Sequence, residues 1–227
     1  MITYYARCFA IVLLLTQPAF AGKVNGTLSS RLDFYPDHAD GTASEGRSAE
    51  VKIDAFHDFE KSRIVGEFIF RGDKKDSGRR ITEARQAYFR SPFAGFDFFV
   101  GNRQEFWGKA ESKNVVDVIN QSDAAANEGK SGKLGAPSIS AERYLDIGDL
   151  QLWYISSFRE KTFNDSDAHP SSGVKINSAQ YARKDGKDAD DFAARLSSFA
   201  GDWDLSLIHI SEPTRPERIS YAVFCLK

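Results

Sequence analysis

The chain has 227 residues, and its 30 basic and 32 acidic side chains give a formal net charge of −2. It has no basic stripe of the kind that follows a phosphate backbone, which argues against nucleic acid as a partner. The two cysteines, Cys8 and Cys225, stand near the two ends, so the sequence between them holds no disulfide framework and no thiolate metal site.

The first 21 residues have the pattern of a secretory signal peptide. Arg7 supplies a positive charge, Phe9–Leu15 is an apolar run, and Ala19-Phe20-Ala21 is a small-x-small cleavage site. A membrane anchor is the alternative, but a helix needs about 20 apolar residues to cross a bilayer. We therefore expect export to the periplasm and a mature chain that begins at Gly22.

Short segments of alternating apolar and polar residues recur from residue 24 onwards. In the first of them Val24 and Leu28 share one face, while Asn25, Thr27 and Arg31 share the other, which is the period of a β-strand. Each segment has about the length that a tilted strand needs to cross a bilayer. The expected strands are 24–34, 48–59, 63–71, 81–90, 96–104, 137–146, 150–160 and 190–199.

The connections between these strands alternate in length. The short ones are 60–62, 91–95, 146–149 and 200–203, and the long polar ones are 35–47, 72–80, 105–136 and 161–189. Residues 175–183 could form a further strand, but that would break the alternation, so we keep them in a loop. Short periplasmic turns that alternate with long outer loops are typical of transmembrane barrels. The predicted fold class is all-β, an antiparallel transmembrane β-barrel of which the chain holds about eight or nine strands.

The alternation also predicts which charges face the lumen, because a charge near the middle of the lipid face costs about 2–4 kcal/mol. The expected inward charges are Arg31, Asp33, Glu50, Lys52, Asp54, Glu67, Arg71, Arg103, Glu142 and Arg159. The strand at 81–90 stays ambiguous, because inward Glu83 and Arg85 would leave Gln86 on the lipid face. Both signs of charge occur, so the pattern predicts no ion selectivity.

Aromatic residues gather near the ends of the expected strands. They are Phe34, Tyr35, Phe59, Phe70, Phe89, Phe93, Phe96, Phe158, Phe163, Phe199 and Trp203. Packing in the core of a soluble β protein is one explanation of these rings. Because aromatic rings also favour the interface between membrane and water, we interpret them as the two girdles of a barrel.

The connection 105–136 is the longest between two expected strands. An open loop cannot lie in hydrocarbon, so it stands above the barrel or folds into the lumen, where its acidic residues would set the charge of a constriction. The alternative is that its polar residues only cap turns, and the sequence leaves both readings open. The residues expected to line or narrow the pore are Arg31, Lys52, Arg71, Arg103, Trp107, Glu111, Asp117, Asn120, Asp123 and Arg159.

Several short motifs cluster in and after this loop. They are FWG-x-x-ES from Phe106, VD-x-INQ-x-D from Val116, KLG-x-P from Lys133, FRE-K-TF from Phe158 and GDWD from Gly201. Together they resemble an uncharacterised family of proteobacterial outer-membrane barrels. The resemblance spans roughly residues 81–204 and implies a porin-like barrel that is longer than this chain, but it implies no particular solute.

The last residues differ in character from the rest. Leu205–Arg215 and Ile219–Lys227 resemble the translation of the two ends of a sequencing adapter, and the three residues between them fit an index sequence. An apolar strand followed by a Pro-rich turn is the alternative. We expect residues 205–227 to be foreign to the natural protein and residues 22–204 to be a partial barrel.

The function that these features predict is a porin-like channel in the outer membrane of a Gram-negative bacterium. Its expected partners are outer-membrane lipids, small solutes and the barrel-assembly machinery. The alternative is a barrel that is not a channel, such as an export or assembly component or a surface-binding scaffold. His38, His57 and His169 have no metal-ligand spacing, and no catalytic motif is present, so we expect no cofactor, no metal and no enzyme activity, although an outer-membrane enzyme such as a lipase is a third hypothesis.

Overall fold

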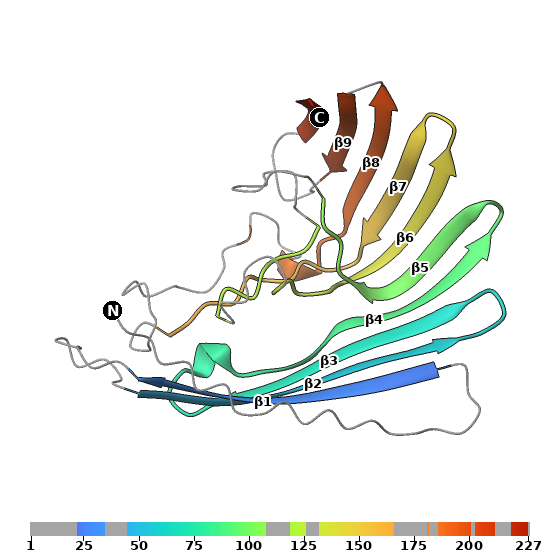
Figure 1. Cartoon of the computed structure of the whole chain (residues 1–227). Coiled ribbons are helices and arrows are strands. Elements are labelled where there is room, and N and C mark those ends of the chain that lie inside the picture. The colour runs from blue at the N-terminus through green and yellow to red at the C-terminus, as the bar shows by residue number, and fades with distance from the viewer. Residues whose placement is uncertain are drawn as a thin grey trace.

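The computed structural model describes residues 22–34, 45–107, 119–125, 132–165, 181, 186–200, 203–211 and 219–226. Ten antiparallel strands form one sheet in chain order (Figure 1). They are β1 (Gly22–Phe34), β2 (Glu45–Asp58), β3 (Arg63–Asp73), β4 (Ile81–Phe93), β5 (Phe96–Arg103), β6 (Ala136–Leu145), β7 (Gly148–Ile155), β8 (Asp191–Ala200), β9 (Trp203–Ser211) and β10 (Ile219–Leu226). Within the described residues, two short 3-10 helices, η1 (Ser77–Arg79) and η3 (Gly186–Asp188), lie in connections.

The predicted all-β antiparallel fold is confirmed, but the sheet is open. Among the described strands, β1 and β10 each pair on one side only, so they are the two edges. The described residues include no helix that is long and apolar enough to cross a membrane. The expected signal peptide, residues 1–21, lies outside the described residues, as does nearly all of the 175–183 segment.

Each of the eight predicted strands is present, and one of them is shorter than expected. The prediction placed 150–160 in a strand, but β7 ends at Ile155. Ser156 still donates its N–H to the carbonyl oxygen of Pro137 in β6. Since proline has no N–H to return, the ladder stops there. Arg159 was therefore wrongly placed in a strand, and it belongs to the connection that follows β7.

Two strands lie in the region expected to be foreign. β9 begins at Trp203 and pairs with β8, and β10 pairs with β9. A sheet edge offers a row of unpaired N–H and C=O groups, and apolar segments such as LSLIHIS readily pair with it. The adapter origin of residues 205–227 stays a prediction.

Short and long connections alternate along the sheet as predicted. The β2–β3, β4–β5 and β6–β7 turns lie along one rim of the sheet, whereas the described parts of the long connections after β3, β5 and β7 lie at the other rim, on the concave side (Figure 1). In the β4–β5 turn Ala94 and Gly95 both have positive φ, 51° and 79°. This is the two-residue hairpin geometry that matches the twist of the flanking strands. The sheet therefore has a turn rim and a connection rim.

One face of the sheet, which we call the apolar face, is exposed and hydrophobic. Directly paired residues form an unbroken row on it from β3 to β8: Ile64, Phe89, Val100, Ile139, Tyr154 and Phe192. Their exposed fractions reach 51 % at Val100 and 55 % at Phe192. Arg47 and Arg143, which share this face, stand near strand ends. An exposed apolar surface of this extent marks a face that meets lipid or another protein.

Some of the aromatic residues predicted at strand ends lie close together at the turn rim, whereas the membrane girdle itself stays a prediction. At the turn rim Phe96 lies 6.0 Å from Phe98, and Phe93 lies 6.3 Å from Phe98, between ring centroids. Phe158 and Phe163 were predicted at strand ends, but they lie in the β7–β8 connection because β7 ends early. Tyr35 and the side chains of Phe34, Phe199 and Trp203 lie outside the described residues.

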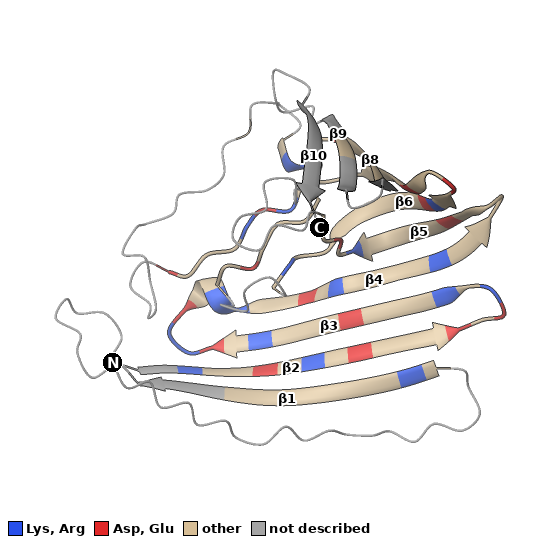
Figure 2. Ribbon diagram, turned by 45° about the horizontal axis from the view of Figure 1, so that its top comes forward, with Lys and Arg blue, Asp and Glu red and all other residues tan. Residues whose placement is uncertain are grey.

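The opposite face, which we call the charged face, carries the predicted inward charges of β2 and β3, which lie opposite one another in the register. Figure 2 marks where the charged residues stand along these strands. Lys52 pairs with Glu67 at 2.8 Å, and Glu67 also accepts a hydrogen bond from Gln86 at 3.0 Å. The strand 81–90, ambiguous in the sequence, is resolved by a β-bulge: Phe68 pairs with Ala84 and Glu67 with Gln86, so Arg85 is the extra residue. The bulge lets Glu83, Arg85 and Gln86 all reach this face.

Candidate functional site

The described parts of the β5–β6 connection, residues 104–107, 119–125 and 132–135, lie against the charged face, and Trp107 anchors the first of them there. This side chain is fully buried, and its Nε1 donates a hydrogen bond to Gln151 of β7 at 2.8 Å. Its apolar cluster also contains Ile119, Ala136, Trp153, Ile155, Ala193 and Ile208. The hydrophobic core of the described residues therefore sits between this connection and strands β6 to β9.

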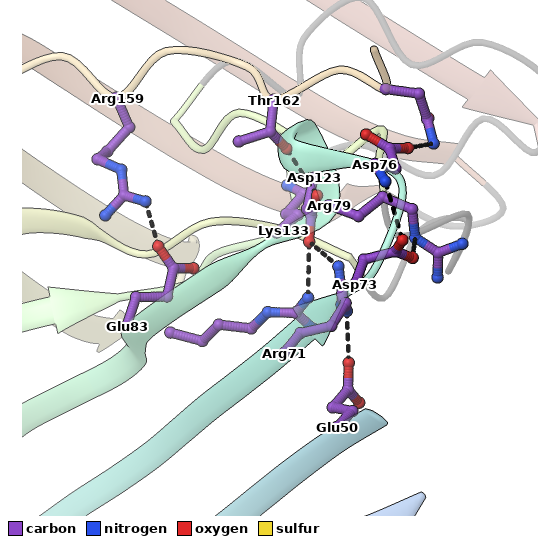
Figure 3. A network of polar contacts seen from close by, with 12 residues as sticks. Glu50, Arg71, Asp73, Asp76, Arg79, Glu83, Asp123, Lys133, Arg159 and Thr162 are labelled. Atoms are coloured by element: carbon purple, nitrogen blue, oxygen red, sulfur yellow. Dashed lines mark hydrogen bonds and ion pairs between the residues drawn. The ribbon is translucent and has the colours of Figure 1, made fainter. Parts of the chain in front are cut away.

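The second anchor of the same connection is ionic and is centred on Asp123 (Figure 3). Its Oδ2 accepts hydrogen bonds from Arg71 of β3 and Arg85 of β4, both at 3.1 Å. Its Oδ1 accepts a hydrogen bond from Thr162 at 2.6 Å. Arg71 also donates to Glu50 of β2 at 2.7 Å. Asp123 is only 4 % exposed, so its carboxylate does not face water. Its negative charge is balanced by Arg71 and Arg85.

Asn120 joins the two limbs of the connection to each other. Its Nδ2 donates to the carbonyl oxygens of Arg103 and Leu134, both at 2.9 Å, and its Oδ1 accepts from the N–H of Glu105 at 2.7 Å. Lys133 donates to the carbonyl oxygen of Glu105. Asn120 therefore holds the described parts of the two limbs together.

Arg103 is the last residue of β5, where the β5–β6 connection begins, and it contacts two aromatic rings and two acidic side chains. Its guanidinium carbon is 3.7 Å from the ring centre of Phe99 and 4.9 Å from that of Trp153. It also pairs with Glu105, at 2.9 Å, and with Glu142. Burial raises the pKa of Glu105, although Arg103 opposes that shift.

The structure brings seven of the ten predicted pore residues onto the charged face or its connections. These are Lys52, Arg71, Arg103, Asn120, Asp123 and Trp107, and Arg159 joins them from the β7–β8 connection through an ion pair with Glu83. Arg31 pairs in register with Ser48, but its side chain lies outside the described residues, as do Glu111 and Asp117. Trp107, Asn120 and Asp123 are buried, so they act by holding the connection.

Sequence reasoning missed Arg85 and Thr162 as members of this site. Arg85 reaches Asp123 because of the β-bulge in β4, and the alternation of residue types does not predict a bulge. Thr162 was expected only as part of a long loop, although the FRE-K-TF motif that contains it was a usable signal.

Gly135 is required where the connection returns to the sheet. A Cβ atom at this position would lie 2.0 Å from the carbonyl oxygen of Arg85. We expect Gly135→Ala to push the connection off the bulge and to cost about 1–3 kcal/mol, the usual penalty of overpacking.

Gly72→Ala is the matched control, because nothing lies within 4 Å of a Cβ built there. Thermal unfolding in detergent should show a lower midpoint for Gly135→Ala alone. Equal midpoints for the two variants would show that the connection does not pack on β4 as described.

The fold and the site define an all-β protein with a single antiparallel sheet, one apolar face, and a charged face covered by its own connections. Within the described ranges no group of three or more His, Cys, Asp or Glu side chains could hold a metal ion. Comparisons with protein-family models, curated proteins and solved structures find no match.

Proposed function

We propose that the chain forms part of an outer-membrane β-barrel that acts as a porin-like channel for small solutes. The observation that carries the proposal is the pairing of an exposed apolar face with a charged face on one continuous sheet. In a barrel the first face meets lipid and the second lines a polar lumen. The strands, of 8 to 14 residues, have the length for tilted membrane crossing.

Closure is a requirement of this proposal. Unpaired backbone groups in hydrocarbon cost several kcal/mol each, so neither edge of the sheet can remain unpaired in a bilayer. The proposed barrel therefore needs further strand pairing at both edges. The signal peptide, the outer-membrane location and the likeness of the motifs at 106–112 and 116–123 to an uncharacterised barrel family belong to the same proposal.

A barrel that is not a channel is the second candidate. The observation that favours it is the tight packing of connections on the charged face, where Trp107 and Leu134 are fully buried and Asp123 is neutralised. A lumen filled in this way would suit an export component or a scaffold whose outer connections bind a partner.

Planar-bilayer recording of the full-length protein separates the two candidates. The channel proposal expects discrete conductance steps that grow with salt concentration. Stable insertion without conductance would favour the second candidate, and failure to associate with the bilayer at all would contradict both.

A further inference from the structure

Residues 156–165, the first part of the β7–β8 connection, cross the charged face and touch three elements that are distant in sequence. We call this segment the strap. Arg159 forms an ion pair with Glu83 of β4 (Figure 3). Thr162 binds Asp123 through its hydroxyl group, and the backbones of the two residues form a parallel β-bridge. The strap is therefore attached both to the sheet and to the β5–β6 connection.

The far end of the strap is attached to the β3–β4 connection. Asn164 donates to Oδ2 of Asp76 at 2.7 Å, and the N–H of Asp165 donates to Oδ1 of the same carboxylate at 3.1 Å. In return, Ser77 donates both its N–H and its hydroxyl to Asp165, at 2.7 and 2.6 Å. These hydrogen bonds from Ser77 lower the pKa of Asp165.

Close backbone packing supports the same attachment. A Cβ atom at Gly78 would lie 2.1 Å from the carbonyl oxygen of Phe163, so only glycine lets the strap pass over η1 at this height. Asp76, which receives the far end of the strap, is 2 % exposed. The strap therefore packs closely on η1, and the carboxylates of Asp123, Asp76 and Asp165 that attach it all accept hydrogen bonds.

We propose that the strap is the second element of the channel constriction and that Thr162 is its positioning residue. Thr162 binds the Asp123 carboxylate of the β5–β6 connection from the side of the strap. Arg71 and Arg85 bind the same Asp123 carboxylate from the sheet. The constriction is therefore built from two connections rather than one. This inference rests on the proposed channel function, but its structural part can be measured without it.

Thr162→Val tests the inference because it removes the hydroxyl and nearly preserves the shape. Two amides report on the β5–β6 connection: the N–H of Asp123 donates to Gly132, and the N–H of Leu134 donates to Gln121 at 2.8 Å. We expect both amides to exchange about fivefold faster with deuterium in the full-length variant, the usual effect of one lost hydrogen bond. Amides of β2 and β3 should not change.

Thr82→Val is the matched control, because Thr82 is exposed on the opposite face of β4, paired with Phe70. Ser77→Ala is a second test at the other end of the strap, where it removes a hydroxyl that binds Asp165. It should speed exchange of the same two amides, so the proposal stays testable if Thr162→Val does not fold.

Measuring conductance as well as exchange shows which of the two proposals fails, the role of the strap or the channel function. Faster exchange together with a higher single-channel conductance in Thr162→Val supports the whole inference. Faster exchange in a protein that never conducts supports the strap and contradicts the channel function. Unchanged exchange in both Thr162→Val and Ser77→Ala overturns the strap, whether or not the protein conducts.

Discussion

Replacing Asp123 with alanine is expected to release the β5–β6 connection from the sheet and to increase single-channel conductance. The change removes the carboxylate that Arg71 and Arg85 share, and all three side chains are at most 6 % exposed. Breaking a buried ion pair by removing one partner costs about 3–5 kcal/mol, because a buried charge is left behind. The β5–β6 connection should then leave the charged face, and the lumen of the proposed channel should become wider.

Limited trypsin digestion and bilayer recording measure the two consequences of Asp123→Ala. Cleavage within the β5–β6 connection should become fast, and conductance should rise. Glu60→Ala is the control, because it removes the same charge from an exposed residue of the β2–β3 turn. Fast cleavage with unchanged conductance would show that the connection lies outside the conducting path, and slow cleavage would contradict the ionic anchor itself.

An arginine at Leu152 is expected to abolish assembly in the outer membrane. Leu152 stands in the middle of β7 on the apolar face and is 41 % exposed. A charge near the midplane of the lipid face costs about 2–4 kcal/mol in a barrel. If this face were in water, the same substitution at an exposed position would cost very little.

Ile147→Arg is the matched control for Leu152→Arg, because Ile147 is 64 % exposed but lies in the β6–β7 turn at the rim of the sheet. Outer-membrane fractions should contain the Ile147→Arg protein and lack the Leu152→Arg protein. Equal amounts of both variants in that fraction would contradict a lipid-facing role for the apolar face.

The strands could be predicted because alternation is a local property of the sequence. Val24 and Leu28 against Asn25 and Thr27 fix the two faces of β1, and the register with β2 agrees with that assignment. The end of β7 could not be predicted from β7 itself. It depends on Pro137 in the neighbouring strand, which lacks the N–H that would continue the ladder.

The site was predicted less completely because its contacts join residues far apart in the chain. Asp123 and Arg71 were both named from sequence, but their pairing depends on how the connection folds back. Arg85 reaches Asp123 only through the bulge, which places two successive side chains of β4 on one face. Asp123, one of the acidic residues predicted to narrow the pore, is a buried partner of two arginines rather than a charge exposed to water.

The central claim is that the apolar face meets lipid while the charged face meets water, and cysteine scanning of β2 tests it most directly. Single cysteines at Val51, Lys52, Ile53 and Asp54, in a protein that otherwise lacks cysteine, are reacted in outer membranes with a charged thiol reagent. We expect rapid labelling at positions 52 and 54 and protection at 51 and 53, which alternate between the two faces. Equal labelling at all four positions, or protection at 52 and 54 instead, would contradict the account.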